Sequence, residues 1–103
     1  MKKYKKNIIH CCHLMDTFTR DPRVGISYSK VMREYYIDLI DSPAKQCAVY
    51  CPFCGDKLPS SVRDQYFEIL EKEYQIDHPR YEEQAKRIPE EFKSDEWWKK
   101  RGL

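Results

Sequence analysis

Five consecutive residues near the middle of the chain, Cys51-Pro52-Phe53-Cys54-Gly55, have the pattern of a zinc knuckle. Two residues between the cysteines let both sulfurs converge on one tetrahedrally bound ion at about 2.3 Å. Pro52 fixes φ where the turn begins, and Gly55 permits the left-handed conformation in which backbone N–H groups approach the sulfurs. The pattern predicts one structural zinc ion.

A knuckle supplies only two ligands, so a second segment is expected to complete the site. The candidate is His10-Cys11-Cys12-His13. In an extended strand, successive side chains point to opposite faces, which would pair Cys12 with His10 or Cys11 with His13. A turn at this point would instead let Cys11 and Cys12 both reach the ion. We favour Cys12 first, then Cys11, then His13 and His10.

The remaining cysteine and histidine are not expected to bind the ion. Cys47 lies about 13 Å before Cys51 along an extended strand, and is predicted to be a small buried side chain. His78 follows Asp77 beside a predicted helix start, and is expected to be exposed.

Two chemical roles compete with a structural one. Cys-Pro-aromatic-Cys also resembles the glutaredoxin active site, but that chemistry needs the motif at a helix N-terminus, where the first thiol's pKa is lowered. Gly55 and Pro59 oppose a helix that begins at Pro52. A catalytic zinc keeps an open coordination position with a carboxylate nearby, whereas cysteine-rich sites are more often closed. The sequence favours a closed structural site.

The bulk properties fit a single small domain. A chain of 103 residues with eight tyrosines builds a thin core that a metal ion would help to stabilise. No apolar run is long enough for a transmembrane helix, and the cluster at residues 10–13 interrupts the only candidate signal sequence. Five cysteines then point to metal in a reducing compartment, so a cytoplasmic location is expected.

The element pattern predicts an α+β fold, a small antiparallel sheet with the zinc site at one end. The predicted strands are residues 7–12, 26–29, 34–41 and 46–50. Two or three helices are expected to follow. The first covers residues 60–74 with Ser60 as N-cap, a shorter one starts from Asp77 with Pro79 in its first turn, a third segment begins at Pro89, and a last helix follows Ser94. The residues expected to form the buried stripe of the first helix are Val62, Tyr66, Ile69, Leu70 and Tyr74. We expect one zinc-binding domain, with residues 60–103 packed on the sheet and metal site of residues 1–59.

Basic and aromatic residues suggest two surfaces for partners. Residues 1–47 carry nine Lys/Arg against five Asp/Glu, although the whole chain has a net charge of only +2. The candidates for phosphate contact are Lys2, Lys3, Lys5 and Lys6 around Tyr4, then Arg20, Arg23, Lys30 and Arg33. In Trp97-Trp98, adjacent side chains on a helix point about 100° apart, so one can enter the core while the other covers an edge. The pair is also a possible protein-interaction site.

Several motifs together resemble a family of small bacterial and phage proteins of unknown function. They are His10-Cys11-Cys12-x-x-Met15, Tyr50-Cys51-Pro52-Phe53-Cys54-Gly55-x-Lys57-Leu58-Pro59, Arg63-Asp64, and Ile88-Pro89-Glu90-Glu91-Phe92-x-x-Asp95-x-Trp97-Trp98. The resemblance spans most of the chain. It implies that the adjacent cysteines and the knuckle belong together, which supports Cys11, Cys12, Cys51 and Cys54 as the ligands. It implies no activity.

The sequence therefore favours a non-enzymatic small zinc protein that acts as a protein-interaction or accessory module. The alternative is a nucleic-acid-binding zinc protein that uses the basic N-terminal half. A thiol redox protein is the third possibility.

Overall fold

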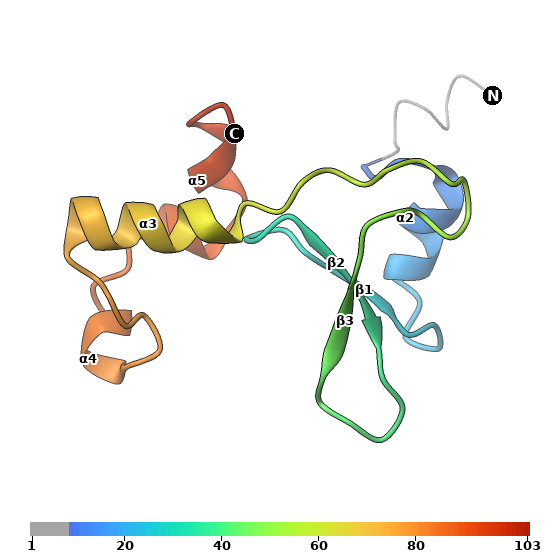
Figure 1. Ribbon diagram of the computed structural model, residues 1–103, viewed down its shortest axis with the longest axis horizontal. Coiled ribbons are helices and arrows are strands. Elements are labelled where there is room, and N and C mark those ends of the chain that lie inside the picture. Colours follow the sequence, from blue (N-terminus) through green and yellow to red (C-terminus); the bar gives the residue numbers. More distant parts are fainter. Residues whose placement is uncertain (1–8) are drawn as a thin grey trace. The chain divides into compact units, whose positions relative to one another are not determined.

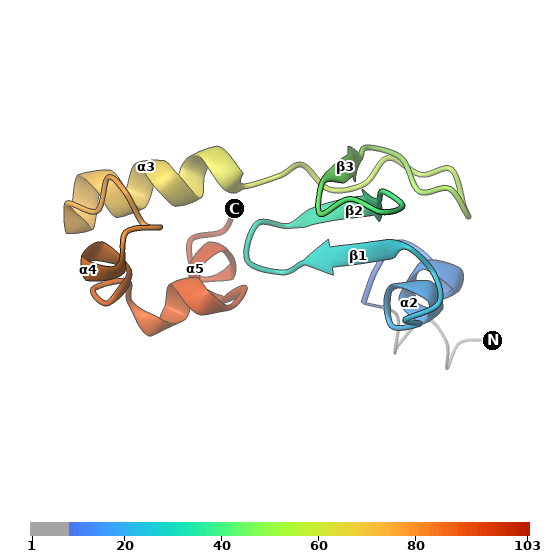
Figure 2. The same ribbon diagram turned by 90° about the horizontal axis from the view of Figure 1, so that it is seen from below.

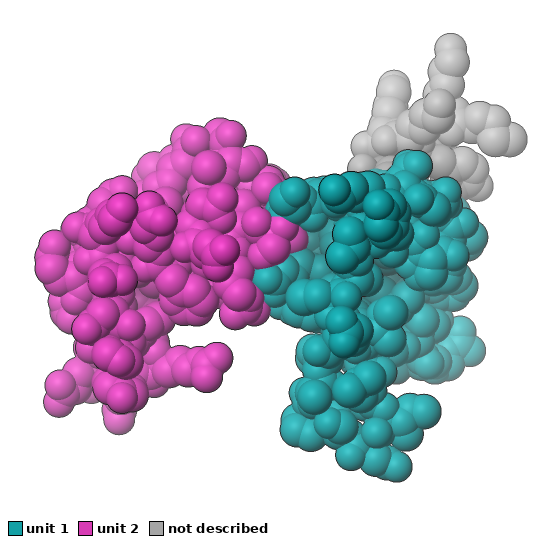
Figure 3. All heavy atoms as spheres, in the orientation of Figure 1, with its two compact units in different colours: residues 1–29, 34–60 teal, residues 30–33, 61–103 magenta. Residues whose placement is uncertain are grey.

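The computed structural model describes residues 9–103, and the chain divides into two compact units, coloured separately in Figure 3. Unit 1 consists of the chain up to Ser29 together with Glu34–Ser60. Unit 2 consists of Lys30–Arg33 and Ser61–Leu103. The basic run Lys2, Lys3, Lys5 and Lys6 lies outside the described residues.

Unit 1 carries a three-stranded antiparallel sheet and one helix (Figures 1 and 2). The strands are β1 (Ile26–Ser29), β2 (Glu34–Asp38) and β3 (Lys45–Ala48), with β2 in the middle. The three strands that the sequence predicted after residue 25 are thereby confirmed, although β2 stops at Asp38 and β3 at Ala48. Together with the helices, the sheet confirms the α+β class.

The strand register decides which side chains face the core of unit 1. Tyr28 pairs with Tyr35, and Tyr35 pairs with Ala48, so these three side chains share one face of the sheet. That face contributes Tyr35 to a buried cluster with Met15, Cys51 and Leu58. The sheet thus supports the knuckle from one side.

The helix α2 (His13–Thr19) replaces the predicted first strand. Residues 10–12 form bends and residue 9 has no regular structure, so the strand over residues 7–12 is wrong for its described part, and residues 7 and 8 lie outside the description. Cys12 is the N-cap, and its sulfur accepts the N–H of Met15. The Asp16 carboxylate accepts the N–H groups of Ile9 and His10 at 2.9 and 2.7 Å. These local bonds satisfy backbone donors that a strand would have needed to pair.

Unit 2 is helical, as the sequence predicted. It contains α3 (Arg63–Tyr74), α4 (Glu82–Ala85), the 3₁₀ helix η1 (Glu90–Lys93) and α5 (Glu96–Lys99). Ser60 does not cap α3, because the helix begins only at Arg63 and Val62 is its N-cap. The Val62 N–H donates to the Met32 carbonyl at 3.0 Å. The helix expected from Asp77 begins only at Glu82.

The core of unit 2 is built on the predicted stripe of α3. Val62, Tyr66 and Leu70 are buried in it, with Ile69 and Tyr74 packed against it. Trp97 is completely buried and stacks on Phe92 with ring centroids 5.4 Å apart. The residues that complete this core are Ile76, Phe92 and Trp97.

The two tryptophans also bind the short segment Lys30–Arg33. The Trp97 indole N–H donates to the Val31 carbonyl at 2.8 Å, and that of Trp98 donates to the Lys30 carbonyl at 2.7 Å. Trp97 therefore anchors the core, and of the two only Trp98 keeps exposed surface.

No helix in the described part of the chain combines the length and the apolar character that a membrane crossing requires.

Candidate metal centre

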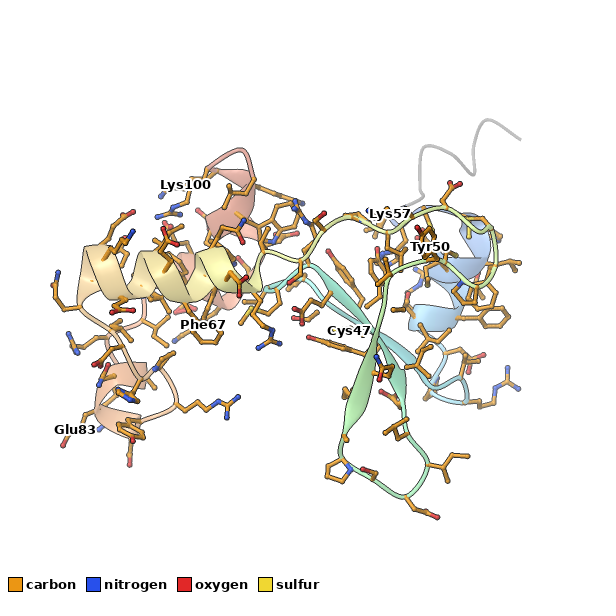
Figure 4. The ribbon with its side chains drawn as sticks, in the orientation of Figure 1. Cys47, Tyr50, Lys57, Phe67, Glu83 and Lys100 are labelled. Atoms are coloured by element: carbon orange, nitrogen blue, oxygen red, sulfur yellow. The ribbon has the colours of Figure 1, made fainter. Side chains whose placement is uncertain are left out.

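The knuckle is a tight turn closed at its neck by backbone hydrogen bonds. Tyr50 and Lys57, labelled in Figure 4, form a β-bridge. The Cys51 N–H donates to the Asp56 carbonyl, and the Gly55 N–H donates to the Cys51 carbonyl, each at 2.9 Å. Gly55 has φ of 81°, the left-handed conformation that the sequence predicted for it.

The turn directs backbone donors at the Cys51 sulfur. The N–H groups of Phe53 and Cys54 lie 3.4 and 3.5 Å from Sγ of Cys51. Burial opposes ionisation of this thiol, but the two N–H groups favour the thiolate and bring its pKa down to about 7. Cys51 is therefore prepared to act as a thiolate ligand.

The second segment presents its cysteines from the start of α2. Cys12 stands in an extended conformation with φ of −157°, and its sulfur accepts the Met15 N–H at 3.4 Å. This hydrogen bond fixes the position of the Cys12 sulfur at the start of α2. Cys11 precedes it in the bend and is half-buried.

The two segments bring four sulfurs together. Sγ of Cys11 lies 3.6 Å from that of Cys54, and Sγ of Cys12 lies 3.8 Å from that of Cys51. All four sulfurs lie within 4.8 Å of one another. Four sulfurs bound tetrahedrally at about 2.3 Å from one ion lie about 3.8 Å apart. The spacing therefore suits a metal ion, and it is too long for a disulfide, whose sulfurs lie about 2 Å apart.

The chemistry of the donors agrees with the spacing. Four thiolates form a soft ligand set that selects zinc or iron over calcium or magnesium. Burial, followed by the proximity of Cys51 and Cys54, raises the pKa of the Cys11 thiol in the metal-free cluster. Four like charges at this distance repel each other strongly unless a cation compensates them. The cluster could hold a metal ion.

Neither histidine of the N-terminal cluster belongs to this group of sulfurs. Nδ1 of His10 makes a hydrogen bond with the Tyr35 hydroxyl, and the ring packs edge-on against Tyr28 and Tyr35. Desolvation by burial lowers the pKa of His10, which favours the neutral ring. His13 is exposed on the first turn of α2.

Cys47 is exposed, so the prediction of a buried side chain is wrong (labelled in Figure 4). It lies on the edge strand β3 opposite Tyr36, on the face of the sheet that does not carry Tyr35. The alternation of side chains along a strand sends Cys47 to solvent for this reason. His78 is exposed as predicted, with Nδ1 3.1 Å from the Asp77 carboxylate.

The other predicted surface residues are distributed over both units. Arg20 and Arg23 are exposed in unit 1, and Arg23 forms a 2.9 Å ion pair with Asp21. Lys30 and Arg33 belong to unit 2, where the Arg33 guanidinium lies 4.8 Å from the centroid of the Trp98 ring. The structure therefore does not join the four residues into one basic surface within a unit.

Three residues that support the site were not singled out from the sequence. The Asp16 carboxylate accepts hydrogen bonds from the backbone of Ile9 and His10. The rings of Tyr28 and Tyr35 pack against the His10 ring. Asp16 could have been found from the sequence, because a carboxylate in the first turn of a helix often binds backbone N–H groups. Nothing in the sequence marks the two tyrosines, because only the strand register places them beside His10.

The comparisons with known proteins identify a family and no activity. The family described as Domain of unknown function (DUF6980) matches residues 1–100 of the chain. No curated protein and no solved structure gives a match.

Proposed function

The chain belongs to a family of domains of unknown function, DUF6980, and we propose that it is a non-enzymatic zinc-binding module whose metal is structural. Cys11, Cys12, Cys51 and Cys54 would hold one zinc ion. The observation that carries the proposal is the spacing of the four sulfurs, which come from two segments 39 to 43 residues apart along the chain and match the edge of a tetrahedron.

A structural role is supported by the number of protein ligands. Four thiolates fill a tetrahedral site, so no position is left for a water or a substrate. The bound ion would supply a cross-link between the start of α2 and the knuckle. Cys51 belongs to the small buried cluster of unit 1, together with Met15, Tyr35 and Leu58. A cross-link here would stabilise a core that is otherwise small.

An interaction role is supported by exposed apolar side chains on the β2–β3 hairpin. Leu39 and Ile40 follow β2, and Ile40 is 91% exposed. Ile37 is also exposed at the end of the sheet face that carries Tyr35. Apolar side chains gathered at a surface are typical of protein contacts. The proposed partner is a protein that covers this hairpin.

The metal half of the proposal is tested by native mass spectrometry with elemental analysis of the full chain. The expected mass is that of a protein with one zinc ion, and elemental analysis distinguishes zinc from iron. Cys51→Ser should lose the ion, whereas Cys47→Ser should keep it, because Cys47 is outside the cluster. A metal-free native protein, or equal loss from both variants, would contradict it.

The interaction half needs a variant that leaves the metal site intact. Ile40→Asp changes an exposed side chain and should abolish the binding of a purified partner while zinc content and thermal midpoint stay unchanged. Equal binding by the wild type and by Ile40→Asp would place the contact elsewhere and would overturn the assignment to this hairpin.

A further inference from the structure

The four sulfurs of the candidate metal centre form two close pairs, and each pair joins the two chain segments. Sγ of Cys11 lies 3.6 Å from Sγ of Cys54, and Sγ of Cys12 lies 3.8 Å from Sγ of Cys51. The partners of the first pair are 43 residues apart along the chain, and those of the second are 39 apart. A covalent bond within either pair would therefore link the start of α2 to the knuckle, as a bound metal ion would.

The two pairs differ in their exposure to solvent. Cys54 is exposed and Cys11 is half-buried, whereas Cys51 is only 2% exposed and belongs to the buried cluster of unit 1. The tip of the knuckle is open, since a Cβ added at Gly55 would meet no heavy atom within 4 Å beyond its chain neighbours. A reagent dissolved in water therefore reaches the pair of Cys11 and Cys54 first, at Cys54.

This exposed pair has the arrangement that thiol oxidation requires. Thiolate character and exposure decide how readily a cysteine is oxidised, and a neighbouring thiol lets the product go on to a disulfide. Metal ligation keeps a cysteine in its thiolate form, and Cys54 combines this state with exposure. Sγ of Cys11, 3.6 Å away, is the sulfur placed to attack an oxidised Cys54. Bond formation shortens this distance to about 2.0 Å.

We propose that hydrogen peroxide oxidises this exposed pair, and that a disulfide between Cys11 and Cys54 replaces the metal ion as the cross-link of unit 1. The inference rests on the proposed function, because it requires the four cysteines to hold a zinc ion. The site thereby releases its zinc in response to a peroxide, while the start of α2 and the knuckle stay joined.

The reaction consumes one peroxide for each disulfide. The Cys54 thiolate attacks a peroxide oxygen, the O–O bond breaks, and a sulfenic acid and a hydroxide ion form. The Cys11 thiolate attacks the sulfenic sulfur, the S–S bond forms, and a second hydroxide ion leaves. The two thiolates lose two electrons, the peroxide gains them, and two protons from the buffer convert both hydroxide ions to water. Only Cys12 and Cys51 remain as ligands, and two thiolates instead of four hold the ion too weakly to retain it.

The first measurement follows zinc in the full chain. Native mass spectrometry determines the zinc content before any oxidant is added, and a metal-free protein at this stage would overturn the proposed function and this inference with it. Hydrogen peroxide is then added, with an untreated sample as the control. We expect the loss of one zinc ion per chain, detected with a chromogenic zinc chelator, and a protein mass lower by two hydrogen atoms. A protein that holds zinc and keeps it under excess peroxide would overturn this inference alone.

Tryptic peptides identify the pair that is oxidised, because the two segments fall in separate peptides, residues 7–20 and residues 46–57. A disulfide between Cys11 and Cys54 joins these peptides, and fragmentation of the joined product locates the bond. A bond confined to the peptide of residues 46–57 would contradict the inference. A first bond within the other, more buried pair of sulfurs would contradict it as well.

Cys47→Ser is the matched control, because Cys47 is also exposed but is outside the group of four sulfurs. This variant should release zinc at the same rate as the wild type and form the same disulfide. Loss of zinc release in Cys47→Ser would show that oxidation starts at Cys47, and it would overturn the assignment to the pair of Cys11 and Cys54.

Hydrogen exchange in unit 1 distinguishes a replaced cross-link from a lost one. Exchange at Met15 and Tyr35 should stay slow in the oxidised, zinc-free protein, because the new disulfide still joins the two segments. A chelator removes the same ion from the reduced protein without forming the disulfide, and exchange there should be about tenfold faster or more. Exchange that is as fast in the oxidised protein as in the chelated one would overturn the replacement of the ion by the disulfide.

Discussion

The sulfur of Cys12 lies 3.8 Å from the sulfur of Cys51, although 39 residues separate the two along the chain. Each of these sulfurs also accepts backbone N–H groups from its own segment. The local hydrogen bonds fix the orientation of each sulfur, and the fold brings the two sulfurs close together. A metal ion bound there would join α2 to the knuckle.

Thiol reactivity should show whether a cysteine is protected by metal binding rather than by burial. Two cysteines are exposed, and only one of these two belongs to the cluster of four. Cys47 and Cys54 are both exposed. In the metal-loaded protein, maleimide is expected to label Cys47 quickly and Cys54 slowly, since a metal-bound thiolate is a poorer nucleophile than a free one. Peptide mass spectrometry after short labelling measures both. Equal labelling of the two thiols would show that Cys54 is not a ligand.

Metal removal by a chelator in a reducing buffer should unfold unit 1. Without the ion, the four thiolates repel one another or become protonated, and the core of unit 1 loses its cross-link. Hydrogen exchange at Tyr35 and Met15 should accelerate by at least tenfold. The core of unit 2 contains no cysteine, so tryptophan fluorescence, which comes from Trp97 and Trp98 of that unit, serves as the internal control. Unchanged exchange and an unchanged thermal midpoint after complete chelation would contradict a structural ion.

Gly55→Ala should destabilise the knuckle by about 1–2 kcal/mol, because the left-handed conformation is costly for an L-residue with a Cβ. Gly55 has φ of +81°, and an added Cβ would meet nothing within 4 Å, so the whole cost is backbone strain. Thermal unfolding measures the loss. Gly25→Ala is the matched control: its Cβ would make only ordinary contacts, the nearest at 3.6 Å, and its effect should be smaller. An equal effect of the two replacements would refute the role of the turn.

The stability of unit 2 should depend on pH through Glu91. The Lys100 ammonium, followed by the Arg101 guanidinium, lowers the pKa of this carboxyl below its ordinary value of 4.5, and both cations lie 2.6 Å away. A lowered pKa means that the ion pairs stabilise the folded state above pH 4.5 and are lost as the pH falls through the folded-state value. Glu91→Gln should therefore lower the thermal midpoint at pH 7.

Below the folded-state pKa of Glu91, the wild type and Glu91→Gln should converge. Glu83→Gln serves as the control, since Glu83 is an exposed residue of α4 in the same unit. A difference between wild type and Glu91→Gln that persists unchanged at pH 2 would indicate a packing effect instead.

The sequence by itself determined the features that depend on neighbouring residues. The knuckle from Cys51 to Gly55 is encoded in one five-residue turn, and its positive φ was predictable from the glycine. The stripe of α3 follows from apolar spacing on a single helix, so Val62, Tyr66 and Leu70 were placed in the core correctly. Cys12 and then Cys11 were favoured as partners of the knuckle from their residue type, and the family resemblance supported the set of four cysteines.

Features that depend on distant residues were decided by the tertiary structure alone. Cys47 was expected in the core, but its exposure depends on which face of the sheet meets α2, and that is a property of the strand register. Residues 9–12 were expected as a strand, yet Cys12 caps a helix because its sulfur and the Asp16 carboxylate satisfy the local N–H groups. Trp97 and Trp98 differ in burial although they are adjacent, since a helix turns them toward different surroundings. Local patterns thus supplied the candidate ligands and most of the elements, and packing between distant segments gathered four sulfurs within 4.8 Å.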